Sequence, residues 1–321
     1  MLKISDLRAK KVLTGDVGIE LEVEGLEPLP TEPPSGWKAK KEDSLRHHGM
    51  EYISDGPIPM NKVRIKFTQL LTKLHAYKLN HGCSRTSLHA HYNVGSKTPI
   101  QVLNRITVYW MVENILARMC GEAREGNVFC LRLKDAEAAL DSLVQSLDYH
   151  PPFMCLSYNV KYAGLNLWAI PAYGSLEVRL KGDCLNIDEG VEWITELHTM
   201  FENADKFENP EAIMDYYLEN GADSFLYKVF STYFENKIKA TVPQWRDLIQ
   251  ENALLVCDLA YAKSWPQWVE NYETKIANKK IKKSSNPYAM LDDMPVYVSA
   301  APTPIYWTTV SNSTNTSEDY P

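Results

Sequence analysis

The feature that most constrains the fold is a strict alternation of acidic and aliphatic residues over Val17–Glu24. Successive side chains of a β-strand point to opposite faces of its sheet, so this alternation predicts a strand with one acidic and one aliphatic face. The acidic face carries Glu20, Glu22 and Glu24. Taken alone, such a strand is more often the solvent-exposed edge of a sheet than a functional site.

Two further segments, Arg85–Val94 and Ser175–Leu180, repeat this alternation with residue types that can carry chemistry. Because residues two apart lie on the same face of a strand, each segment predicts a polar face opposite an aliphatic one. The polar residues are Arg85, Ser87, His89, His91 and Asn93 in the first segment and Ser175, Glu177 and Arg179 in the second. Taken alone, the first segment is explained equally well by satisfied surface histidines, and the second is explained more often by a cross-strand or diagonal Glu–Arg pair than by a functional site.

Helices are predicted between these strands. Apolar spacing predicts a helix from about Asn61 to Asn80, ended by Gly82, and a capping box over Thr98–Gln101 opens another that runs to about Met119. Further helices are expected over Asp135–Leu147 and from Asn186. Strands are expected near Met50–Ile53 and Leu165–Ile170. A turn is expected at Pro171–Gly174 and a Pro-rich loop at Leu26–Lys38.

This order of elements predicts an α+β protein with one open sheet face and a helical C-terminal part. We expect a first domain over residues 1–205, a helical part over 206–278 packed on it, and a tail over 279–321. The tail begins with the basic run Lys279–Lys283 and continues in a stretch rich in Pro, Ser and Thr. That composition is typical of a disordered terminus, and less often of a docking segment.

Composition and charge exclude several classes of protein. Hydrophobic residues make up 45% of the chain, which is enough for a globular core, and the net charge of −7 argues against a general nucleic-acid binder. The most apolar stretch, Ala253–Ala262, is interrupted by Asp258, so we expect no membrane span, and the charged N-terminus does not resemble a signal peptide. Six cysteines without a Cys-x-x-Cys pair predict reduced thiols and a cytoplasmic protein.

The polar strands gain significance when they are considered together. If their carboxylates converge, each ionised pair about 5 Å apart repels by roughly 3 kcal/mol at an effective dielectric near 20, so protons or cations must neutralise them. Oxygen donors with one or two imidazoles suit Mg²⁺ or Mn²⁺ better than Zn²⁺. Arg85 and Arg179 would add positive charge for a phosphate, and divalent metals beside arginines indicate phosphoryl chemistry. The carboxylates concerned are Glu20, Glu22, Asp43, Glu51 and Glu177.

Known nucleotide and hydrolase motifs (the P-loop, the dinucleotide-binding glycines and the Gly-x-Ser-x-Gly elbow) do not occur in the chain. Six other short motifs do occur, namely Gly18–Glu22, Asp43–Leu45, Gly49–Ser54, Ser87–Val94, Leu165–Leu167 and Gly174–Arg179. In this order they resemble the motifs of carboxylate–amine ligases, and the chain is similar to the amidoligases of bacterial and phage genomes over roughly residues 15–190. These belong to the superfamily of glutamine synthetase, glutamate–cysteine ligase and the ligase for prokaryotic ubiquitin-like protein.

The resemblance implies a curved antiparallel sheet like that of the glutamine synthetase catalytic domain, with helices packed behind it. Its polar concave face would bind ATP and two or three Mg²⁺ or Mn²⁺ ions. The expected metal ligands are Glu20, Glu22, Asp43, Glu51, His89 and Glu177. The expected catalytic residues are Arg179, His91 and Arg85, and the expected cofactor-binding residues are Lys161, Arg124 and Asn93.

The chain departs from the family pattern at two positions, one in the turn at Asp43 and one at Lys161. The chain reads Asp43-Ser where the family often has Asp-Gly-Ser, and Lys161 stands where an arginine is expected before Tyr162. A lysine keeps the charge but loses the planar, bidentate geometry of an arginine, so the affinity for substrate or phosphate could differ.

The function implied is ATP-dependent formation of an amide or isopeptide bond, through an acyl phosphate, between the carboxylate and the amine of amino-acid or peptide substrates. Two alternatives stay open. One is a metal-dependent hydrolase that uses the same face, and the other is an inactive ligase fold that serves as a binding protein. No nucleic-acid or membrane partner is expected.

Glu113 falls on the apolar stripe of its predicted helix. A buried carboxylate needs a partner, so we expect either an ion pair with Arg85, Arg124 or Arg179, or a direct role towards substrate.

Overall fold

The computed structural model describes residues 2–8, 12–124, 126–149, 151–156 and 161–285, of which 276–285 are described by their backbone alone. Met1–Thr274 form one compact unit and Lys275–Pro321 a second. Helix α10 (Trp265–Ser285) continues through the basic run of the predicted tail, so residues 279–285 are helical rather than disordered. The rest of the predicted tail lies outside the described residues.

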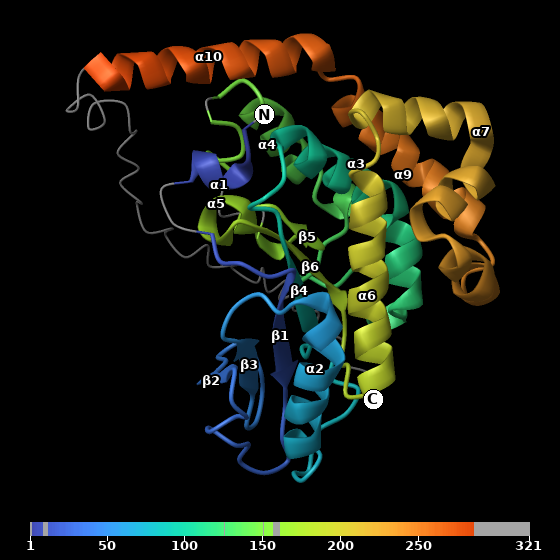
Figure 1. Cartoon of the computed structure of the whole chain (residues 1–321). Coiled ribbons are helices and arrows are strands. Elements are labelled where there is room, and N and C mark those ends of the chain that lie inside the picture. The colour runs from blue at the N-terminus through green and yellow to red at the C-terminus, as the bar shows by residue number, and fades with distance from the viewer. Residues whose placement is uncertain (1, 9–11, 125, 150, 157–160, 286–321) are drawn as a thin grey trace, which may run out of the picture. The chain divides into compact units, whose positions relative to one another are not determined.

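Within the described residues, six strands form one open antiparallel sheet with the order β2-β3-β1-β4-β6-β5 (Figure 1). The mixture of helices with this sheet confirms the predicted α+β class. The strands are β1 (Val17–Val23), β2 (Trp37–Lys41), β3 (Met50–Ser54), β4 (Leu88–Asn93), β5 (Leu165–Asn166) and β6 (Ser175–Lys181).

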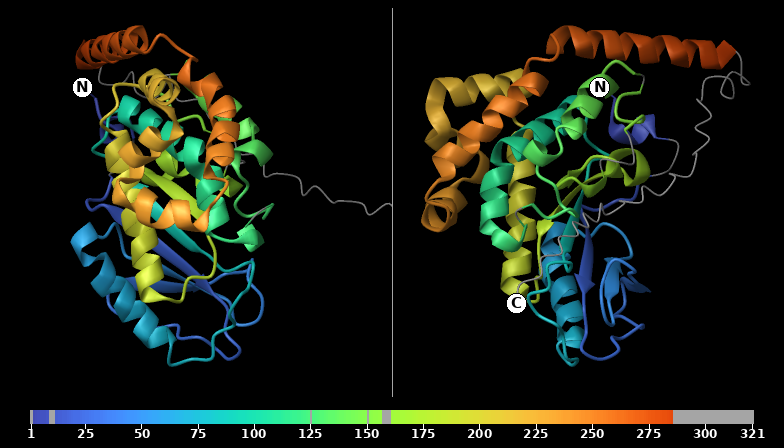
Figure 2. Two further views of the ribbon diagram at one scale, coloured as in Figure 1. Left: turned by 90° about the vertical axis from the view of Figure 1, so that its right-hand side faces the viewer. Right: turned by 180° about the vertical axis from the view of Figure 1, so that it is seen from behind.

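Helices α2 (Met60–Leu74), α3 (Pro99–Met119) and α6 (Ile187–Ala204) lie on the aliphatic side of the sheet (Figures 1 and 2). On this side Ile19 and Leu21 of β1 are fully buried. The hydroxyl of Tyr92 in β4 donates a hydrogen bond to the carbonyl of Ile194 in α6 at 2.9 Å. Because apolar burial against the helices stabilises this side, the polar residues of the same strands lie on the opposite face.

Helix α3 is the central helix of the core and begins as the capping box predicts. The Thr98 hydroxyl accepts a hydrogen bond from the Gln101 N–H at 3.3 Å, and the Gln101 side chain accepts one from the Thr98 N–H at 3.0 Å. Pro99 occupies the first helical position. Helices α7 (Pro210–Phe230) and α9 (Trp245–Ala260) also pack on α3, so nearly all of its length is buried.

The smaller elements complete the described chain. They are α1 (Ile4–Leu7), η1 (Glu122–Arg124), η2 (Leu133–Asp135), α4 (Ala138–Ser146), α5 (Ala169–Tyr173), η4 (Phe234–Ile238) and α8 (Lys239–Thr241).

Two predicted elements have different bounds in the structure. Helix α2 ends at Leu74 rather than near Asn80, because the chain that follows returns to the end of β1: the Leu26 N–H donates to the Lys78 carbonyl at 2.8 Å. The strand expected over Leu165–Ile170 stops at Asn166 and gives way to α5.

The position of α5 has a local cause. The Asn166 side chain accepts a hydrogen bond from the Trp168 N–H at 3.0 Å, which turns the chain out of the strand. Gly174 then ends α5 with φ of 79°, a left-handed conformation that favours glycine. The predicted turn over Pro171–Gly174 is therefore mostly helical.

The predicted loop Leu26–Lys38 is also too long, because its last residues open strand β2. Trp37 pairs with Ser54 of β3 and is 5% exposed. Burial of this large ring favours the strand. The strand could not be predicted from the sequence, because its exposed lysines do not alternate with apolar residues.

A buried ionic network joins α3 to the end of α6. Arg105 is 2% exposed and donates to both carboxylate oxygens of Asp205 at 2.7 Å. Arg105 also donates to Glu202 at 2.6 Å, and Lys97 lies 2.7 Å from Asp205. Because a bidentate arginine–carboxylate pair is geometrically specific, this network fixes the position of α3 relative to the end of α6.

All six cysteines lie among the described residues and are free, as predicted. Over the described part of the chain, the helices are too short or too polar to cross a membrane.

Candidate metal and phosphate site

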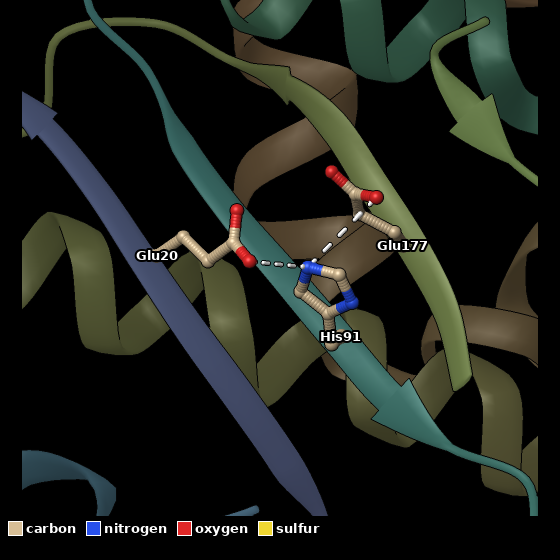
Figure 3. Close-up of side chains that lie close together, drawn as sticks. All are labelled: Glu20, His91 and Glu177. Atoms are coloured by element: carbon tan, nitrogen blue, oxygen red, sulfur yellow. Dashed lines mark ion pairs between the residues drawn. The ribbon is translucent and has the colours of Figure 1, made fainter. Parts of the chain in front are cut away.

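Glu20, His91 and Glu177 come together on the polar face of the sheet from the adjacent strands β1, β4 and β6 (Figure 3). The register places His91 opposite Glu177, and Glu20 opposite His89. The His91 Nε2 atom lies 3.2 Å from Glu20 Oε1 and 3.8 Å from Glu177 Oε2. One ligand atom from each of the three residues lies within 4.8 Å of the others, which is a spacing that a single metal ion can span.

His89 lies beside the same two carboxylates. Its Nδ1 atom is 3.4 Å from Glu20 Oε2 and 3.5 Å from Glu177 Oε1. Each carboxylate therefore presents one oxygen to His91 and the other oxygen to His89. Both glutamates were predicted as metal ligands, together with His89, whereas the three-residue cluster contains His91, which was predicted as a catalytic residue.

Ser87 fixes the orientation of the His89 ring. Its hydroxyl donates a hydrogen bond to Glu22, and its oxygen lies 2.7 Å from His89 Nε2. A hydroxyl has a single hydrogen, so once it is donated to Glu22 the oxygen accepts the Nε2–H of His89. The Nδ1 atom of His89 then faces one oxygen of each glutamate.

The protonation of the cluster also indicates a need for positive charge. Burial alone raises the pKa of Glu20 and of Glu177, but the neighbouring histidines, and Arg179 beside Glu177, outweigh burial and lower both pKa values. Burial lowers the pKa of His91, yet the carboxylates of Glu177 and Glu20 raise it to about 9. In the protein alone, His91 therefore carries a proton at neutral pH, and this single positive charge offsets part of the charge of the two carboxylates.

Two donors hold Glu177 in place. The side-chain amide of Asn166 donates to Glu177 Oε2 at 2.6 Å, and Arg179 donates to Oε1. The Arg179 Nε atom donates in turn to the carbonyl of Phe129 at 3.3 Å. Asn166 belongs to one of the family motifs and Ser87 to the predicted polar face, but no role was predicted for either residue.

The other predicted carboxylate ligands differ in their surroundings. Glu22 and Glu51 are opposite each other on β1 and β3 and are 8% and 5% exposed. Glu51 forms an ion pair with Lys40 of β2 at 2.5 Å. Asp43 is exposed in the turn that follows β2 and lies outside the three-residue cluster, so its role as a ligand stays a prediction.

Two predicted cofactor-binding residues contact the backbone around the site. Arg124 is 3% exposed and donates to the carbonyls of Leu180 at 2.8 Å and Arg179 at 2.6 Å. The Asn93 amide donates to the carbonyls of Leu13 at 2.7 Å and Gly15 at 2.8 Å. These contacts fix the end of β6 and the segment before β1, and a contact with a cofactor stays a prediction.

Lys161 and Arg85 lie beside two aromatic rings. The Lys161 ammonium is 4.6 Å from the centre of the Tyr162 ring, and the Arg85 guanidinium is 5.9 Å from the centre of the Phe129 ring. Arg85 also donates to the carbonyl of Ser44 at 2.7 Å.

Glu113 is buried on the other side of the sheet and forms none of the three expected ion pairs. Its Oε2 atom accepts a hydrogen bond from the Leu133 N–H at 2.6 Å, at the start of η2. A Cβ atom on Gly164 would lie 2.7 Å from Oε1, so any other residue at this position would displace the carboxyl group. Burial raises the pKa of Glu113 to about 8, against the smaller opposing effects of Leu133 and Arg132. The group is therefore mostly protonated at neutral pH and holds η2 on α3.

We expect Glu113 to make stability fall as the pH rises. Between its ordinary pKa of 4.5 and about 8, the folded state holds a proton on Glu113 that the unfolded state releases. The free energy of unfolding then decreases with pH, by up to about 1.4 kcal/mol per pH unit. Glu113→Gln mimics the protonated form, so its stability relative to the wild type should increase from pH 5 to pH 8 in urea unfolding. A difference that does not change with pH would contradict this assignment.

Comparison of the chain with protein-family models and with curated proteins finds no match. The family resemblance therefore rests on the sequence motifs alone.

Proposed function

We propose that the protein is an ATP-dependent ligase that joins a carboxylate to an amine, with a catalytic sheet like that of glutamine synthetase. The observation that carries the proposal is the cluster of Glu20, His91 and Glu177, in which Arg179 donates a hydrogen bond to Glu177. Such a cluster combines metal-binding groups with a phosphate-binding cation, which is the pair of features that phosphoryl transfer needs.

The residues present fit a divalent cation. The His91 Nε2 atom is buried and has no hydrogen bond of good geometry within the described part of the chain, and two carboxylates lie around it. Carboxylate oxygens with an imidazole suit Mg²⁺ or Mn²⁺. Glu20, His91 and Glu177 would hold one ion, and His89 with the second oxygens of the two glutamates is positioned for another. Bound ions would supply charge neutralisation for the phosphates of ATP.

The chain's own residues then have distinct tasks. Arg179 would stabilise the charge on the transferred phosphoryl group, because its planar guanidinium matches phosphate oxygens. Asn166 and Ser87 would keep Glu177 and His89 in orientation. A carboxylate is a poor electrophile, so transfer of the γ-phosphoryl group first makes an acyl phosphate. Attack by the amine then forms the amide and releases phosphate, with ADP as the other product.

A thermal-shift experiment tests the proposal. Mn²⁺ and ATP together should raise Tm by several degrees, because a ligand at about 100 times its Kd adds about 2.7 kcal/mol of stability. ADP release should follow the addition of amino acids or peptides, and mass spectrometry should identify an amide product. A metal-dependent hydrolase would instead cleave an isopeptide or a phosphoester without nucleotide. If the metal and ATP leave Tm unchanged, the ligase proposal fails.

A further inference from the structure

Next to Arg179 lies a group of aromatic and cationic side chains, which we call the Phe129 cluster: Arg85, Phe129, Lys161 and Tyr162. The rings of Phe129 and Tyr162 lie 6.4 Å apart in an edge-to-face arrangement. Arg85 lies over the first ring and Lys161 over the second. Tyr162 is 41% exposed, so part of its ring surface is open to a ligand.

Hydrogen bonds fasten this cluster to the phosphate side of the site. Arg179 donates through Nε to the Phe129 carbonyl at 3.3 Å, and its N–H donates to the Gly164 carbonyl at 2.8 Å. The Leu131 N–H donates to the Tyr162 carbonyl at 2.8 Å, so the two segments of the cluster run side by side. Arg179 thus lies between the Phe129 cluster and Glu177, to which it donates.

A second aromatic pair lies towards the opposite end of β6. Tyr173 is 59% exposed, and its ring lies 5.8 Å from that of His91 and 6.0 Å from that of Trp168. Tyr173 precedes the first residue of β6, whereas Arg179 stands near its last residue. The cluster of Glu20, His91 and Glu177 therefore has an aromatic group on each side along β6. The cationic residues Arg179, Arg85 and Lys161 lie on the Phe129 side.

We propose that the Phe129 cluster binds the base of the nucleotide, that the phosphates extend from it past Arg179 to the cluster of Glu20, His91 and Glu177, and that the Tyr173 side receives the carboxylate and amine substrates. This orientation rests on the proposed function. An exposed aromatic ring offers a stacking surface to any nucleobase, worth about 1–3 kcal/mol per base. The adjacent guanidinium and ammonium groups complement the negative charge of the phosphates that follow.

The experiment compares ATP with inorganic tripolyphosphate, which has the phosphates but no base. Affinities are measured by calorimetry in the presence of Mg²⁺ for the wild type, Tyr162→Ala and Tyr162→Phe. Tyr162→Ala should weaken ATP binding about 5- to 150-fold, the equivalent of one lost stacking contact, and should leave tripolyphosphate binding unchanged. Tyr162→Phe keeps the ring and should bind ATP like the wild type. Tyr227→Ala, which removes an exposed tyrosine of α7, is the matched control and should bind both ligands normally.

The outcomes separate this orientation from the proposed function. If the wild type binds both ligands and Tyr162→Ala weakens neither, or both equally, the base does not bind at the Phe129 cluster although the ligase proposal stands. If Tyr162→Ala changes the KM for the amino acid and not the affinity for ATP, the cluster binds a substrate side chain and the orientation is reversed. If the wild type binds neither ATP nor tripolyphosphate, the proposed function fails and the orientation fails with it.

Discussion

Glu177→Gln should abolish ATP-dependent turnover and weaken Mn²⁺ binding by at least about 10- to 100-fold. Substitution of a residue that only hydrogen-bonds to a metal ligand already lowers metal affinity by this factor. The substitution keeps the shape of the side chain but removes a charge that faces both His91 and His89. It also removes the carboxylate that holds Arg179 in place. Calorimetry with Mn²⁺ and an ADP-release assay measure the two effects.

A matched control is Glu235→Gln, which removes an exposed glutamate of η4 that pairs with Lys239. This variant should bind Mn²⁺ and turn over like the wild type. Urea unfolding of Glu177→Gln checks that the fold is retained, because a glutamine has the same shape and its side-chain oxygen can still accept a hydrogen bond from Arg179. Wild-type Mn²⁺ affinity in a folded Glu177→Gln protein would refute the assignment of Glu177 to the metal.

Arg105→Ala is expected to destabilise the protein by about 3 kcal/mol, the lower end of the range for breaking a buried ion pair. The substitution leaves the Asp205 carboxylate, whose side chain is 8% exposed, without its bidentate partner. Lys97 remains 2.7 Å from Asp205 and limits the loss. The packing of the guanidinium over the Phe201 ring is lost as well. The midpoint of urea unfolding measures the effect.

Arg246→Ala provides the comparison, because Arg246 and Asp223 also form a bidentate pair, but with side chains that are 65% and 48% exposed. An exposed pair contributes only about 0–1 kcal/mol. Equal losses in the two variants would show that burial is not what makes the Arg105 network stabilising. Metal affinity should be unchanged in both, because neither arginine contacts the polar face of the sheet.

The sequence alone determined which residues share a face and where several elements begin. Alternation in β1, β4 and β6 placed Glu20, His91 and Glu177 on one side, because the two-residue period of a strand is a local property. The starts of α3 and α6 followed from short capping motifs, which act within four residues: the Asn186 side chain accepts a hydrogen bond from the Glu189 N–H.

Only the tertiary structure decided which polar residues meet and what each one contacts. The pairing of His91 with two glutamates depends on the register of three strands that are far apart in the sequence. Arg124 carries a charge that suggests a ligand, yet it donates to backbone carbonyls of β6, and Glu113 accepts from a backbone N–H rather than from an arginine. A backbone partner leaves no mark in the residue pattern, because every residue except proline offers the same N–H and C=O groups.

The same reason explains why some elements begin or end at other residues than the sequence predicts. Strand β2 forms because β3 supplies its partners and buries Trp37, and α2 ends early because the chain after it bonds to the end of β1. Both outcomes depend on long-range contacts, which outweigh local propensity when they bury a large side chain or satisfy backbone groups. Local patterns therefore determined the two faces of the sheet, whereas the order and register of its strands determined the site.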